Sequence, residues 1–167
     1  MDWSEAVSLA RSLMIQHGVG HLPLLQSRAR TVAGATTFAV RKVGGVVVEA
    51  NAKSIELSRP IVELNPREVV HDVVLHEIAH AKAGFEAGHG LAWRAAAIAV
   101  GARPERCCGE GVVAPTGKYT ATCACAGRIH SVHRLPRVAR VCCDCGKLLL
   151  WRFPATHRKR GSYDTAR

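Results

Sequence analysis

The chain has 167 residues, 48% of them hydrophobic and 5% aromatic, which allows one domain with an appendage or two small domains around aliphatic cores. Its formal net charge of +10 is uneven: residues 1–101 hold ten Lys and Arg against nine Asp and Glu, whereas residues 102–167 hold thirteen against four. We expect a cytoplasmic protein rather than a membrane or secreted one, because no apolar run could span a bilayer and the acidic start, Met1–Glu5, lacks the apolar segment of a signal peptide.

The first part of the chain predicts a helix followed by a small antiparallel sheet. Asp2 can cap a helix that runs to about His17. The pair Gly44-Gly45 is a two-residue hairpin signal between apolar runs, and Pro60 is expected to end the last strand. The predicted strands are residues 37–43, 46–50 and 54–58.

A buried helix is predicted from Asn65 to Gly84. Asn65 would be its N-cap, with Pro66 at the first helical position, and Gly84 would stop it. Between them the chain is rich in valine and other apolar residues and contains no helix breaker. Because apolar residues cover much of the helix surface, we expect it to lie in the core.

Residues 76–80 of that helix read H-E-x-x-H. His76 and His80 are four residues apart, so they share a helix face and can bind one metal ion. Two histidines buried without partners would be costly, whereas metal ligation satisfies them. Glu77 lies beside the pair and is the expected general base that takes a proton from water. The pattern predicts the catalytic zinc site of a peptidase.

The third zinc ligand is expected to be His89. A glycine on each side lets the backbone turn sharply there, just before a second predicted helix over residues 91–100. Glu86 is the alternative ligand, but it needs the first helix to continue past Gly84. His71 lies five residues before His76 and is expected to have a structural or surface role.

The seven cysteines all lie within residues 107–145, behind a domain boundary expected at Pro104. In a cytoplasmic protein such clustering favours metal ligation over disulfides. Two close pairs are separated by an arginine-rich stretch, and the second pair reads C-x-x-C-G, which predicts a zinc ribbon with one structural Zn²⁺. The predicted ligands are Cys123, Cys125, Cys142 and Cys145.

Three cysteines are left over. Cys143 could replace Cys142 as the ligand, but adjacent thiolates seldom bind one ion together and C-x-x-C is the usual spacing, which favours Cys142. Cys107 and Cys108 are expected to be small buried hydrophobic residues.

The positive charge after residue 101 predicts a surface for a polyanion, most simply DNA or RNA. The alternative is a basic face that is only solvated. Arginines near and between the cysteine pairs are the candidate phosphate contacts: Arg128, Arg134, Arg137 and Arg140. The basic end of the chain, residues 152–167, is expected to be a disordered tail.

The protease motif followed by a cysteine ribbon resembles the SprT-like family, which includes bacterial SprT proteins and the DNA–protein crosslink protease Spartan. The segments that carry the resemblance are residues 54–58, 76–80, 89–93, 119–125, 129–134 and 141–146. It implies an α+β fold with a zincin-like metalloprotease domain over residues 1–104 and a small β zinc ribbon over residues 105–151. The family's zinc ligands and general base would be His76, His80, His89 and Glu77.

Two functions remain open from the sequence. The first is a zinc metalloendopeptidase that acts on nucleic-acid-associated proteins, could associate with the nucleoid, and holds an extended substrate along residues 54–58 by strand addition. The second is a nucleic-acid-binding zinc protein with a non-proteolytic or regulatory role. Glu77 favours the first, because a purely structural three-histidine site has no need of a carboxylate there.

Overall fold

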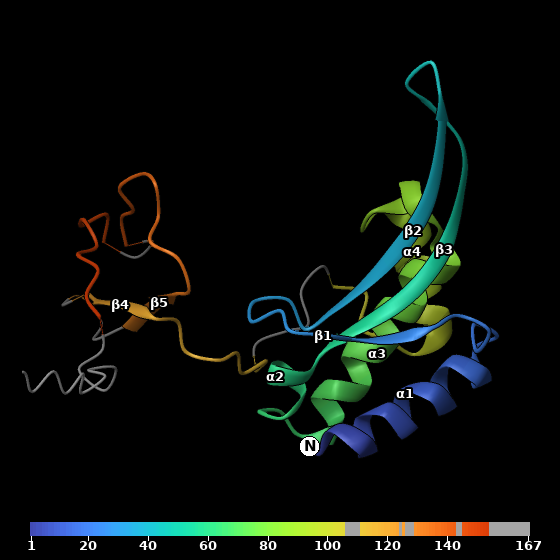
Figure 1. Ribbon diagram of the computed structural model, residues 1–167, viewed down its shortest axis with the longest axis horizontal. Coiled ribbons are helices and arrows are strands. Elements are labelled where there is room, and N and C mark those ends of the chain that lie inside the picture. Colours follow the sequence, from blue (N-terminus) through green and yellow to red (C-terminus); the bar gives the residue numbers. More distant parts are fainter. Residues whose placement is uncertain (106–110, 124, 126–128, 143–144, 154–167) are drawn as a thin grey trace, which may run out of the picture. The chain divides into compact units, whose positions relative to one another are not determined.

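The computed structural model describes residues 1–105, 111–123, 125, 129–142 and 145–153. The chain is a mixed α+β protein with small sheets, and it divides into two compact units, Met1–Pro115 and Thr116–Arg167 (Figure 1). No helix in the described ranges is both long and apolar enough to cross a membrane.

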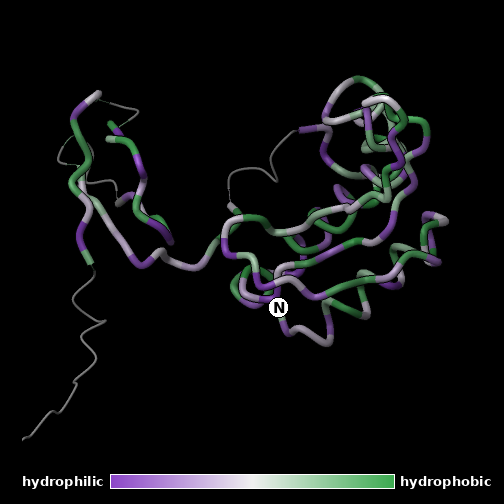
Figure 2. Tube along the Cα trace, turned by 45° about the horizontal axis from the view of Figure 1, so that its top comes forward, coloured by the Kyte–Doolittle hydropathy of each residue, from purple (hydrophilic) through white to green (hydrophobic). Residues whose placement is uncertain are grey.

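The first unit contains most of the regular structure. Its elements in chain order are α1 (Trp3–Gln16), β1 (Leu24–Ser27), β2 (Gly34–Val43), β3 (Val46–Ser58), α2 (Arg59–Val62), α3 (Arg67–Ala83), the 3-10 helix η1 (Phe85–Ala87) and α4 (Leu91–Val100). Helix α3 is central, since it contacts α1, α4, β2 and β3. Figure 2 shows hydrophobic and hydrophilic residues interleaved along this unit, as expected for elements that each bury one face.

Helix α1 begins where the sequence predicts. The Asp2 side chain accepts a hydrogen bond from the Ser4 backbone N–H at 2.8 Å, and the helix ends just before His17. Its inner face packs toward α3 and buries Ala6, Leu9, Ala10, Leu13 and Met14.

The three-stranded sheet has the order β1-β3-β2. The predicted hairpin is present: Gly44 and Gly45 have φ of 57° and 82°, which suits a tight turn, and Val43 pairs with Val46. The sheet is mixed rather than antiparallel, because β1, which was not predicted, runs parallel to β3. The two strands predicted at 46–50 and 54–58 are one continuous strand.

Residues 54–58 form the middle of the sheet, and their predicted use as a substrate-binding edge is wrong. Residues 55–58 pair with β1 on one side, and residues 54–57 pair with the start of β2 on the other. Their main-chain hydrogen-bonding groups are therefore engaged within the sheet. Strands β1 and β2 each have one neighbour within the described ranges, so they are the strands with an open edge.

Helix α3 begins at Arg67, but Asn65 does not cap it as predicted. The N-cap position is Pro66, and no side chain caps the helix. Asn65 instead faces the core: its Nδ2 donates to the carbonyl oxygens of Ile61 and Val113, both at 2.6 Å, and its Oδ1 accepts from the Val113 N–H at 2.7 Å. Asn65 therefore holds the segment around Val113 in place through these hydrogen bonds.

The second unit is small and consists of strands. Strands β4 (Tyr119–Thr122) and β5 (Ile129–Val132) are antiparallel, and Thr120 also bridges to Arg152. Its buried cluster contains Ala121, Cys123, Cys142 and Leu149, with Trp151 packed against them. Two of the four predicted metal ligands are thus part of its core, which is too small to hold a fold by apolar burial alone.

Candidate metal centres

Three histidines from two segments meet at one point in the first unit. His76 and His80 lie one turn apart on α3, and His89 lies between η1 and α4. The Nε2 atom of His89 is 3.1 Å from the Nε2 atoms of both other rings. Nitrogens that bind one tetrahedral zinc ion at about 2.1 Å are about 3.4 Å apart, so this donor set fits such an ion.

Trp93 packs against the histidine cluster and is fully buried. Its ring centroid is 4.7 Å from that of His76, 5.3 Å from His80 and 4.6 Å from His89. One rigid indole therefore packs against all three imidazoles and limits how each can turn. The sequence places Trp93 four residues after His89 but does not reveal this shared contact.

Burial keeps two of the imidazoles neutral. Desolvation, with a smaller contribution from neighbouring histidines, lowers the pKa of both His76 and His80 to about 4. At neutral pH both rings are unprotonated and can offer a nitrogen lone pair to a cation. The cluster is therefore better suited to holding a metal ion than to carrying positive charge itself.

Glu77 is buried on α3, one residue after the first histidine, and is 5% exposed. Burial raises the pKa of its carboxyl to about 7, although hydrogen bonds from Thr36 lower it. The Thr36 hydroxyl is 3.0 Å from Oε2 of Glu77 and 2.8 Å from its main-chain oxygen. A buried carboxyl group with so few partners is characteristic of a functional site.

The other candidates near this cluster lie outside it. Glu86 is exposed on η1, and His71 is half-buried on α3. Neither belongs to a group of possible metal ligands within the described ranges. The continuation of α3 that Glu86 would need does not occur, because the helix ends at Gly84, whose φ is 89°.

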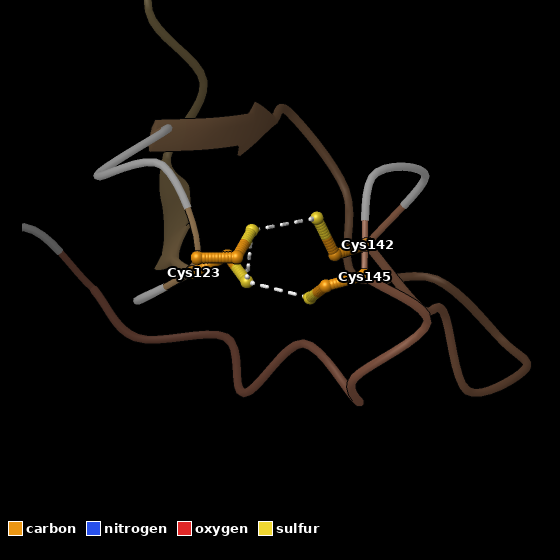
Figure 3. Close-up of side chains that lie close together, drawn as sticks. Cys123, Cys142 and Cys145 are labelled. Carbon is orange, nitrogen blue, oxygen red and sulfur yellow. Dashed lines mark hydrogen bonds between the residues drawn. The ribbon is translucent and has the colours of Figure 1, made fainter.

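Four cysteine sulfurs converge in the second unit (Figure 3). The Sγ atom of Cys123 is 3.2 Å from that of Cys125 and 3.3 Å from that of Cys145, and the Cys125 and Cys142 sulfurs are 3.7 Å apart. Sulfurs that bind one tetrahedral zinc ion at about 2.3 Å are about 3.8 Å apart, so this set also fits a metal ion.

Backbone geometry shapes the second half of the cysteine cluster into a tight turn. Cys142 N–H donates to the Lys147 carbonyl at 2.8 Å, and Gly146 N–H donates to the Cys142 carbonyl at 2.9 Å. Gly146 has a φ of 68°, which explains the glycine after the last cysteine. Hydrogen bonding to the Cys125 backbone and to neighbouring thiols lowers the pKa of Cys123 to about 7, whereas the contact with Cys123 raises the pKa of Cys125, so the cluster favours one thiolate, on Cys123.

Some sequence predictions lie outside the described residues: Cys107, Cys108, Cys143 and Arg128. The other three predicted nucleic-acid contacts, Arg134, Arg137 and Arg140, are exposed. None of these three forms an ion pair with a described residue.

Comparison with known proteins gives one match. The sequence profile of the SprT-like family matches residues 12–111, a range that holds all three clustered histidines and Glu77. No curated protein and no solved structure matches the chain. Because the matched range covers more than half of the chain, the protein belongs to the SprT-like family.

Proposed function

We propose that the protein is a zinc metalloendopeptidase that cleaves proteins associated with nucleic acid. The observation that supports this best is the buried carboxyl group of Glu77, which follows His76 on the helix that carries two of the three clustered histidines. A cluster that only stabilised the fold would gain nothing from this carboxyl group, because burying it costs solvation energy. Membership of the SprT-like family independently supports a metalloprotease-like domain.

The two donor sets suit zinc in two different roles. His76, His80 and His89 offer three nitrogens, and three protein ligands are typical of a catalytic zinc ion with a position left for water or substrate. An ion held there would polarise a peptide carbonyl and make coordinated water more acidic. The four cysteines leave no open position and suit a structural zinc ion.

Glu77 would hold and move the proton during peptide hydrolysis. Its carboxylate takes a proton from the attacking water, and the resulting carboxylic acid returns that proton to the nitrogen of the departing amine. A pKa of about 7 suits both steps near neutral pH, because either form is then readily reached.

The open edge of β2 is the proposed place for an extended substrate. An extended peptide can add to an exposed sheet edge through main-chain hydrogen bonds. The contacts of Gly34 and Thr36 with Glu77 bring the first residues of β2 next to the proposed general base. A peptide on this edge would therefore have its backbone close to the groups that cleave it.

The second unit would bring the protease to its substrates by binding DNA or RNA. Arg134, Arg137 and Arg140 are exposed and free of ion pairs with described residues, and we include Arg128 in the same surface from its position in the sequence. Contacts from such residues to phosphates give affinity with little base preference. This surface also supports the second candidate function, a nucleic-acid-binding zinc protein without proteolytic activity.

A single substitution separates the two functions. Glu77→Gln keeps the shape of the side chain and should leave zinc content and thermal stability near those of the wild type. It should abolish cleavage of a DNA-bound protein, which is measured by mass spectrometry of the products. Glu86→Gln is the matched control, because Glu86 is exposed and lies outside the cluster. If the wild type and Glu77→Gln give the same products, or neither gives any, the peptidase is rejected and the second function is favoured.

A further inference from the structure

We infer that Thr36, at the start of β2, is a positioning residue that holds the Glu77 carboxylate in place for proton transfer, and that Gly34 on the same strand leaves the space this side chain needs. The inference rests on the proposed function. It concerns residues of the sheet rather than of the H-E-x-x-H motif, and 41 positions separate Thr36 from Glu77 in the chain.

A single hydroxyl group contacts both ends of Glu77. Thr36 Oγ1 is 2.8 Å from the main-chain oxygen of Glu77 and 3.0 Å from its Oε2. The carboxyl end of the side chain is thereby tied to the backbone of the helix that carries it. Threonine suits this task because its β-branched side chain has few rotamers.

The hydroxyl can serve Glu77 before and after it takes a proton. A threonine hydroxyl carries one hydrogen and two lone pairs, whereas the main-chain oxygen can only accept. With a bare carboxylate, the hydroxyl can donate to Oε2. With a carboxylic acid, Oε2 can donate to Thr36 while Thr36 donates to the main-chain oxygen. The same atoms stay in contact in both forms, so the carboxyl group need not move between the two proton transfers.

Gly34 leaves the space that the Glu77 side chain occupies. A Cβ atom at position 34 would lie 2.8 Å from Cγ of Glu77 and 3.0 Å from its Oε1, and 3.1 Å from Val73. The φ of Gly34 is not positive, so its backbone conformation does not require glycine. The close approach of the strand to Glu77 does, because any side chain would displace the carboxyl group.

The position of both residues is fixed by the sheet. Gly34 pairs with Leu57 and Thr36 with Ile55, and both β3 partners are fully buried. Strand β2 also contacts α3, across which the sheet lies in Figure 1. A shift of one residue would turn the side chains of β2 to the opposite face, so the buried partners keep Thr36 directed at Glu77.

The kinetic test compares Thr36→Val, which removes only the hydroxyl, with Thr36→Ser, which restores it. Thr36→Val should retain zinc and lower kcat by roughly 10- to 100-fold with little change in KM, because the reacting group is misplaced; Thr36→Ser should recover most of the loss. Thr37→Val is the matched control, since it removes a neighbouring hydroxyl whose partner, at 2.6 Å, is the buried Ser54 Oγ rather than Glu77. An equal loss of kcat in the Thr36→Val and Thr37→Val proteins, or no loss in Thr36→Val, would overturn the inference.

A second measurement does not depend on activity. Gly34→Ala should lower the Tm of the wild-type protein but lower it less than half as much in a Glu77→Ala background, where the clash with the carboxyl group is absent. Equal losses in both backgrounds would show that Gly34 is not needed to make room for Glu77 and would overturn that part of the inference. A wild-type protein that cleaves nothing would reject the proposed function, and this cycle would still decide whether the sheet holds Glu77.

Discussion

At the scale of single residues, the histidine cluster depends on a residue that offers no ligand atom. The ring of Trp93 lies against all three imidazoles, so packing against it helps to orient these metal-binding rings. Its Nε1 is buried and has no hydrogen-bond partner within the described part of the chain. The role of Trp93 is therefore packing, and an aromatic ring of similar shape could perform it.

Two substitutions of Trp93 distinguish the packing of its ring from the polarity of its N–H group. Trp93→Ala should lower the free energy of unfolding by about 3–5 kcal/mol and weaken zinc binding, because it opens a cavity under the histidines. Trp93→Phe should lower the free energy of unfolding and the zinc affinity much less, since it keeps an aromatic ring and removes an unsatisfied N–H. Chemical denaturation and zinc titration of both variants test this. If Phe proves as damaging as Ala, the indole N–H is needed and Trp93 does more than pack.

Local sequence patterns predict some contacts between single residues and miss others. The spacing of His76 and His80 predicts their meeting because a helix repeat connects them. Asn65 followed by proline predicts a helix cap, yet its amide contacts Val113, 48 residues away, and nothing in the local sequence reveals that contact. Thr36 was missed for the same reason, since its importance comes from a contact between a strand and a distant helix.

At the scale of elements, the predictions with a strong local pattern are confirmed. The Gly44-Gly45 hairpin and the helix over residues 91–100 are both present. Strand β1 and the order of the sheet were not foreseen, because strand pairing is set by contacts between distant segments. This difference matters for function, since it places residues 54–58 in the middle of the sheet and leaves β1 and β2 at its edges.

Metal binding by the cysteine cluster should determine the stability of the second unit. Cys142→Ser or Cys145→Ser should remove one zinc equivalent and make residues after 115 sensitive to a probe protease, because the small core has little else to hold it. Cys143→Ser should behave like the wild type. Limited proteolysis followed by mass spectrometry measures this, and damage confined to Cys143→Ser would show that the ligand assignment is wrong.

At the scale of the whole molecule, the two units divide chemistry and charge between them. The first unit holds the histidine cluster and nearly balanced charge, whereas the excess of Lys and Arg lies after residue 101. This division suits a protease whose substrate is selected by what it is bound to rather than by its own sequence. The charge asymmetry is visible in the sequence, but the orientation of one unit toward the other does not follow from it.

Nucleic-acid binding can be assigned to the second unit by reversing charge. Replacing Arg134, Arg137 and Arg140 by Glu should weaken DNA binding strongly at about 50 mM salt and make it less dependent on salt, because fewer counterions are released. The control replaces three exposed basic residues of the first unit by Glu: Arg28, Arg30 and Lys53. Fluorescence anisotropy with labelled DNA and RNA measures both. Equal weakening in both variants would indicate a general effect of net charge.

We propose that the chain holds two separate zinc sites and that the histidine cluster is the one that carries the chemistry. Metal analysis of protein purified without chelator tests it most directly. The wild type should contain about two equivalents of zinc, and His80→Ala should contain about one, retained by the cysteines, with no cleavage activity. A wild type with one equivalent that His80→Ala leaves unchanged would show that the histidine cluster holds no zinc and would contradict the account.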